Sequence, residues 1–139
     1  MPVPRRIGPV VTETAAIVAF LAARLDEDRA VAREAAGLHW VAEEPAIGIV
    51  LVDGEPLIEG HITGLTAHIA RHDPVRVLRD VEAKRAILRR CGSRMNEPDQ
   101  WPNGLVSPRA VLARQNLMDL AAVYSDHADY RAEDWAPKP

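Results

Sequence analysis

Two histidines, His68 and His72, lie four residues apart and are the side chains of this sequence best suited to chemistry. On a helix this spacing places both imidazoles on one face, where their ring nitrogens can bind the same ion. Imidazole is a common ligand of zinc, so zinc is the candidate cofactor. A third ligand would come from His127 or from one of the alternatives His61, Cys91 and Asp126.

The same spacing also has a structural interpretation. Leu65, His68, Ile69 and His72 follow the pattern i, i+3, i+4, i+7 of a buried helical stripe, so both histidines would point inward. There they would pack and hydrogen-bond to backbone or to a carboxylate without binding an ion. The sequence leaves both interpretations open, and the structural one predicts that His72→Ala lowers stability.

The next two residues, Asp73 and Pro74, predict a junction between helices. A residue before proline disfavours the helical conformation, Asp is a preferred N-cap, and proline suits the first position of a helix. The His-Asp pair also bears on catalysis, because metal-dependent phosphohydrolases carry their metal ligands in the order His, His-Asp, Asp. This chain has a similar order in His39 or His61, then His72-Asp73, then Asp126 or Asp129. Those enzymes have the His-Asp pair inside a helix, whereas Pro74 follows it here, so we predict no catalytic residues.

A positively charged segment covers residues 71–94, which hold eight basic residues against three acidic ones. The chain as a whole carries a net charge of −3 and has no general attraction to polyanions. Within the segment, Arg76, Arg79 and Arg85 are candidates for contacting a phosphate or a protein partner. No aromatic residue for base stacking lies between them. Nucleic-acid binding is therefore an alternative to protein binding.

Helix signals on both sides of the histidines indicate the elements that must position these residues. Caps and apolar periodicity predict helices over residues 12–36, 64–72, 74–90 and 108–124. Between the first two, short β-branched runs and the pair Asp53-Gly54 predict a hairpin. The predicted fold class is therefore α+β, mostly α, with about four helices and a small antiparallel β-hairpin between the first and second helices.

The remaining features of the sequence predict the limits of the domain and its cellular compartment. Residues 1–11 are rich in proline and glycine and predict a flexible leader, followed by a single α-rich domain over residues 12–139. No apolar run is long enough for a membrane span. Cys91 is the single cysteine, which excludes an internal disulfide and indicates a reducing, cytoplasmic location.

Three blocks of the chain resemble a family of small uncharacterised proteins of actinobacteria and their phages: residues 17–28, the run HIARHDPVRVLRDVEAKRAIL, and the tail YSDHADYRAEDW. The resemblance implies no activity. Members of the family hold a cluster of cysteines before the last helix, ahead of a Trp-Pro-Cys, which would suit zinc. This chain has Trp101-Pro102-Asn103 in that place and keeps only Cys91, so a zinc site of the family type is not expected.

Taken together, the residues predict a small, non-catalytic accessory domain that acts through protein–protein contacts, including contacts with its own copies. The first alternative is a domain that binds or depends on a metal through His68 and His72. The second is nucleic-acid binding through the arginine-rich helix expected over residues 74–90.

Overall fold

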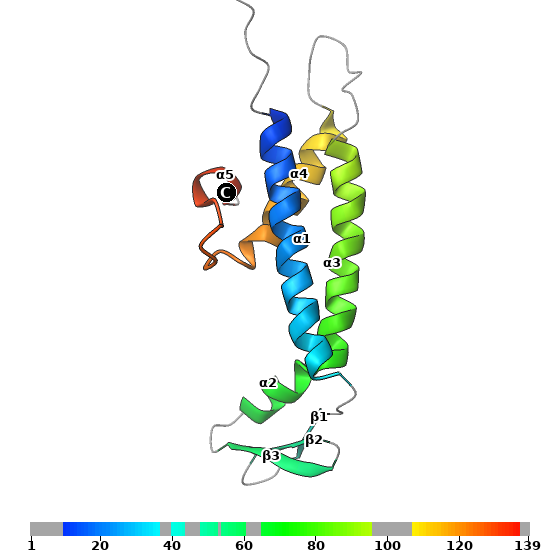
Figure 1. Cartoon of the computed structure of the whole chain (residues 1–139), viewed down its shortest axis with the longest axis vertical. Coiled ribbons are helices and arrows are strands. Elements are labelled where there is room, and N and C mark those ends of the chain that lie inside the picture. The colour runs from blue at the N-terminus through cyan, green and yellow to red at the C-terminus, as the bar shows by residue number, and fades with distance from the viewer. Residues whose placement is uncertain are drawn as a thin grey trace, which may run out of the picture. The chain divides into compact units, whose positions relative to one another are not determined.

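A computed structural model describes residues 10–36, 40–43, 48–52, 54–60, 65–95 and 107–136 (Figure 1). The helices are α1 (Val10–Glu34), α2 (Leu65–Arg71), α3 (Pro74–Met95), α4 (Pro108–Ala122) and α5 (Ala132–Trp135). Three strands stand between α1 and α2, namely β1 (Trp40–Glu43), β2 (Gly48–Val52) and β3 (Glu55–Gly60). Most of the predicted leader, residues 1–9, lies outside the described residues, and α1 begins at Val10 rather than near Thr12.

The predicted fold class is wrong. The described chain is mostly helical with five helices, so the α+β class with about four helices does not hold. In place of the single hairpin expected between α1 and α2, the described ranges hold three short strands that pair antiparallel in the order β1-β2-β3. The sequence signal for α5 was missing because a helix of one turn has no periodicity to detect.

Contacts divide the chain into two compact units, and the division falls inside α1 and α3. The first unit is Met1–Leu25 with Lys84–Pro139, and the second is Asp26–Ala83. The prediction of a single domain over residues 12–139 stays a prediction.

The first unit buries apolar side chains from four helices. They are Ile17, Phe20, Leu21 and Leu25 of α1, Leu88 and Cys91 of α3, Ala113, Leu117 and Ala121 of α4, and Trp135 of α5. The alanines among them let α4 approach its neighbours closely, and the spacing Ala113, Leu117, Ala121 places one residue per turn on its inner face. This unit also contains a groove between α3 and α4 and a cluster of aromatic and polar side chains next to α5.

The second unit consists of the end of α1, the three strands, α2 and the start of α3. Helix α2 contacts all three strands. Ala32 and Val81 are buried, and Arg29 lies 3.7 Å from the Glu82 carboxylate in an ion pair. Gly54 has φ of +83°, a conformation that side-chain-bearing residues rarely adopt, at the turn into β3.

Helix α3 continues through Gly92 to Met95, beyond its predicted end at residue 90. A glycine inside a helix costs only about 1 kcal/mol relative to alanine, which packing of a long helix outweighs. A side chain at this position would face α1, because a Cβ built on Gly92 would lie 3.7 Å from Cγ2 of Val18. No described helix is long and apolar enough to cross a membrane.

Candidate functional site

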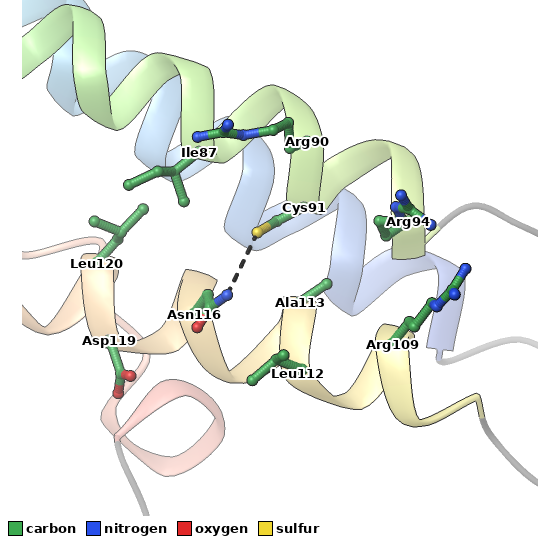
Figure 2. Close-up of a pocket in the computed structure, with 10 residues that line it drawn as sticks. All are labelled: Ile87, Arg90, Cys91, Arg94, Arg109, Leu112, Ala113, Asn116, Asp119 and Leu120. Atoms are coloured by element: carbon green, nitrogen blue, oxygen red, sulfur yellow. Dashed lines mark hydrogen bonds between the residues drawn. The ribbon is translucent and has the colours of Figure 1, made fainter.

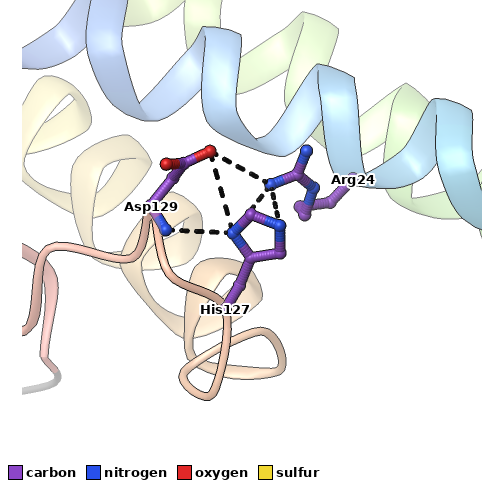
Figure 3. Close-up of polar contacts among 3 residues, drawn as sticks. All are labelled: Arg24, His127 and Asp129. Atoms are coloured by element: carbon purple, nitrogen blue, oxygen red, sulfur yellow. Dashed lines mark hydrogen bonds and ion pairs between the residues drawn. The ribbon is translucent and has the colours of Figure 1, made fainter.

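A group of polar and aromatic side chains in the first unit joins α1 to residues 124–135. We call it the tail cluster, and its members are Phe20, Arg24, Tyr124, His127, Asp129, Tyr130 and Trp135. At its polar end, Nη1 of Arg24 lies 2.9 Å from Nδ1 of His127 and 3.7 Å from Oδ2 of Asp129 (Figure 3). Arg24 is only 8% exposed, so its charge is held in place by these two partners.

The imidazole of His127 contacts both Asp129 and Arg24. The backbone N–H of Asp129 donates to Nδ1 of His127 at 3.0 Å, so this nitrogen carries a lone pair and no proton. The guanidinium of Arg24 lies against the same ring at both of its nitrogens. These contacts make the His127 ring part of the tertiary structure, because they connect residues 127–129 to α1. A metal ion at His127 would have to displace the guanidinium, and the predicted ligand role of His127 receives no support from this geometry.

The apolar end of the tail cluster surrounds the Phe20 ring. Its centroid lies 5.0 Å from that of Trp135, 6.2 Å from Tyr130 and 6.3 Å from Tyr124. Trp135 is 3% exposed and has the Arg131 guanidinium over its ring at 5.5 Å. Tyr130 and Trp135 therefore hold the tail of the first unit against Phe20 of α1. Aromatic pairs of this kind add about 0.5–1.5 kcal/mol beyond the area that they bury.

The pair His68 and His72 lies in the second unit and is exposed. Leu65 on the same helix is 40% exposed, so the prediction that these residues form a buried stripe is wrong. The physical reason is the length of α2: a helix of seven residues contacts the strands but is too short to bury a full stripe. The two imidazole centroids are 4.4 Å apart. Within the described ranges, no three His, Cys, Asp or Glu side chains gather in a way that could hold a metal ion.

Asp73 and Pro74 form the junction between α2 and α3. The backbone N–H of Arg76 donates to Oδ1 of Asp73 at 2.6 Å, which is the geometry of an N-cap, and Pro74 takes the first helical position. The guanidinium of Arg76 also donates to the backbone carbonyl of Arg71 at 3.0 Å. Arg76 therefore closes the end of α2 while its own N–H is capped by Asp73.

The three arginines predicted to contact a phosphate or a partner belong to different units. Arg76 belongs to the junction, Arg79 is exposed in the second unit, and Arg85 is partly buried in the first unit. Their role in binding phosphate or a partner stays a prediction.

A groove between α3 and α4 of the first unit has a volume of about 680 Å³ (Figure 2). Its lining is apolar (Ile87, Leu112, Ala113, Leu120), basic (Arg90, Arg94, Arg109) and otherwise polar (Cys91, Asn116, Asp119). Figure 2 shows Arg94 and Arg109 at one end of the groove and Ile87 and Leu120 at the other. The Asn116 amide lies 3.9 Å from Sγ of Cys91, in a weak hydrogen bond across the floor. We refer to this feature as the α3/α4 groove.

Sequence reasoning missed the groove. The signal that could have pointed to it was the continuation of the basic segment through Arg90 and Arg94 beyond the predicted end of the helix. Arg109 follows Ser107 and Pro108, which begin α4: the Ser107 hydroxyl accepts the backbone N–H of Arg109 at 3.2 Å. This cap places Arg109 in the first turn of α4, whereas Arg94 lies in the last turn of α3.

Comparison with protein families matches residues 14–137 to a family model described as "Family of unknown function (DUF6221)". Comparisons with curated proteins and with solved structures gave no match.

Proposed function

The chain belongs to the family of unknown function DUF6221, whose model covers all but its ends, and on this premise we propose that it is a non-catalytic module that binds another protein through the α3/α4 groove. The observation that carries the proposal is the groove itself, in which an apolar surface is bordered by three arginines. We propose that the occupant is an acidic amphipathic helix of the partner.

The apolar part of the groove favours a helical occupant. Leu112 is 58% exposed and lies beside Ala113. The wall formed by α4 therefore has a projecting leucine side chain next to a depression at the small alanine side chain. Two packed helices present such a groove to a third helix, whose leucines at i, i+3, i+4 and i+7 can enter it. Binding would remove the exposed leucine from water, which stabilises the complex by about 25 cal/mol for each Å² of apolar surface buried.

The charges of the groove favour an acidic occupant. Arg90, Arg94 and Arg109 line it together with one acid, Asp119, whereas the whole chain has a net charge of −3. Guanidinium groups bind carboxylates through two parallel hydrogen bonds, so glutamates along one face of a helix suit them. Electrostatic attraction of this kind chiefly speeds association and selects the partner.

The proposal can be tested with a synthetic helical peptide about as long as the 15-residue α4. The peptide carries leucines at helical spacing along one face and glutamates on both sides of that leucine stripe. We expect fluorescence anisotropy to show binding that weakens about tenfold or more in the double variant Arg90→Glu, Arg109→Glu and in Leu112→Glu. Higher salt should also weaken it, because exposed charges are screened.

Matched controls come from outside the groove. Arg79→Glu makes the same charge change in the second unit, and Val123→Glu changes an exposed aliphatic residue just beyond α4. Both should leave peptide binding unchanged. Equal binding of a peptide with lysines in place of the glutamates would contradict the acidic partner, and unchanged binding in Leu112→Glu would contradict the groove as the site.

The cellular setting is part of the same proposal. We propose a cytoplasmic location, which the single, buried Cys91 supports because it offers no disulfide for an oxidising compartment. Self-association through the same groove predicts a concentration-dependent mass in sedimentation that Leu112→Glu abolishes.

A further inference from the structure

The exposed histidine pair of the second unit has a geometry that the protein-binding proposal does not use. His68 lies in α2 and His72 follows its last residue. Their ring centroids are 4.4 Å apart, with 40° between the ring planes, and both side chains are exposed. Neither imidazole is therefore committed to a buried core, and water or an ion can reach both.

The hydrogen bond of His72 settles which of its nitrogens is open. Nδ1 of His72 lies 2.9 Å from the backbone carbonyl oxygen of His68. A carbonyl oxygen can only accept, so Nδ1 carries the proton and donates. In the neutral ring Nε2 then keeps its lone pair. Histidines that bind metals have this arrangement, with the non-ligating nitrogen donating to a carbonyl or carboxylate that fixes the ring.

The charged groups next to the histidine pair already have hydrogen-bond partners, which limits the number of protein ligands for a metal ion. The Asp73 carboxylate next to the pair is engaged by the N–H of Arg76, and the Arg76 guanidinium donates to the carbonyl of Arg71. No cluster of three ligands occurs among the residues that the structure describes. A metal ion here would have two imidazole ligands, and water would fill its remaining positions.

We propose that His68 and His72 form an open two-ligand site for a divalent transition-metal ion. Imidazole ligands suit Cu²⁺, Ni²⁺ and Zn²⁺, and the usual order of stability makes Cu²⁺ the tightest of these. The site is distinct from the α3/α4 groove and does not depend on its function. The nearby cations Arg71 and Arg76 repel an ion, so affinity should rise at higher salt, where this repulsion is screened.

The test uses the complete chain without a histidine tag, titrated with Cu²⁺ alone and with Zn²⁺ alone. Electron paramagnetic resonance of one bound Cu²⁺ should show two nitrogen ligands, and titration calorimetry should show one ion per chain. His68→Ala and His72→Ala should each weaken binding about tenfold or more and leave a single nitrogen at the copper. Zn²⁺ should shift the side-chain nuclear magnetic resonance signals of these two histidines.

Control variants separate this site from the other histidines. His39→Ala and His61→Ala should leave the affinity and the copper spectrum unchanged, and circular dichroism should show that every variant is folded. If His68→Ala and His72→Ala bind Cu²⁺ as tightly as the unmodified chain, the proposal is wrong. A copper spectrum with only one nitrogen ligand in the unmodified chain would also overturn it.

Discussion

His127 and the pair His68 and His72 make opposite use of the same side chain. The ring of His127 reaches Arg24, which lies 103 positions earlier in the sequence, and accepts the N–H of Asp129. The ring of His72 bonds to the carbonyl of His68, one turn away. The first histidine is part of the tertiary structure, whereas the second pair is held locally and faces outward. Residue type alone therefore says little about role, and the number of long-range partners says more.

This comparison predicts how the cost of substitution should differ between the two regions. Because the chain has two compact units, each cost is best measured locally, by hydrogen exchange of the backbone amides near the change.

Trp135→Ala should have the largest effect. Trp135 is 3% exposed and contacts the Phe20 and Tyr130 rings, so its removal leaves a cavity that costs about 3–5 kcal/mol. Amides of residues 124–135 should then exchange much faster. Trp135→Phe keeps a ring next to Phe20 and should retain part of the protection. Unchanged exchange in Trp135→Ala would mean that the tail is held by something other than the tail cluster.

His127→Ala should cost less, about 1–3 kcal/mol, because it removes the acceptor for the Asp129 N–H and for the buried Arg24. The same amides report the change. His127→Gln supplies a side-chain carbonyl as acceptor and should recover part of the protection. A full loss in both variants would show that the ring contact with Phe20, at 5.8 Å between centroids, matters more than the hydrogen bonds.

Asp73→Ala should destabilise the start of α3 by about 1 kcal/mol, because the Arg76 N–H loses its capping carboxylate. Exchange of the amides of residues 75–77 should rise. Asp73→Asn is the matched control, since asparagine caps about as well as aspartate. Equal exchange in the alanine and asparagine variants would show that Pro74 alone fixes the helix start.

His68→Ala and His72→Ala should have the smallest effect, within about 0.5 kcal/mol, because both side chains are exposed and the hydrogen bond of His72 to the His68 carbonyl is to the preceding turn. This result reverses the expectation from the sequence, in which His72 was a packed residue. Thermal unfolding and exchange of α2 amides measure it. A loss as large as that of His127→Ala would remove the contrast between the two regions.

Local signals in the sequence predicted local structure well. Asp73 and Pro74 indicated the start of α3 at Pro74, and Ser107 with Pro108 indicated the start of α4, because caps and prolines act within one turn. The end of α3 at Met95 was missed, since Gly92 weakens a helix only slightly and the packing of the whole helix decides.

Long-range structure was much less predictable. The partner of His127 is Arg24, and nothing in the sequence near either residue indicates the other. The helical periodicity predicted that the His68 side chain points inward, because a helix face that carries leucine usually packs against a core. Leu65 on that face is 40% exposed, so the prediction was wrong. The α3/α4 groove depends on how two helices lie together, so Arg90 and Arg109 could not be linked in advance.

Cys91 lies in the floor of the α3/α4 groove, is 7% exposed and is the only thiol in the chain. A thiol-reactive dye can therefore attach at one position, and only when the groove opens enough to admit it. The labelling rate of the unmodified protein reports on this opening. A ligand that covers the groove should slow the reaction without any engineered cysteine, so the molecule already contains the reporter needed to screen for its partner.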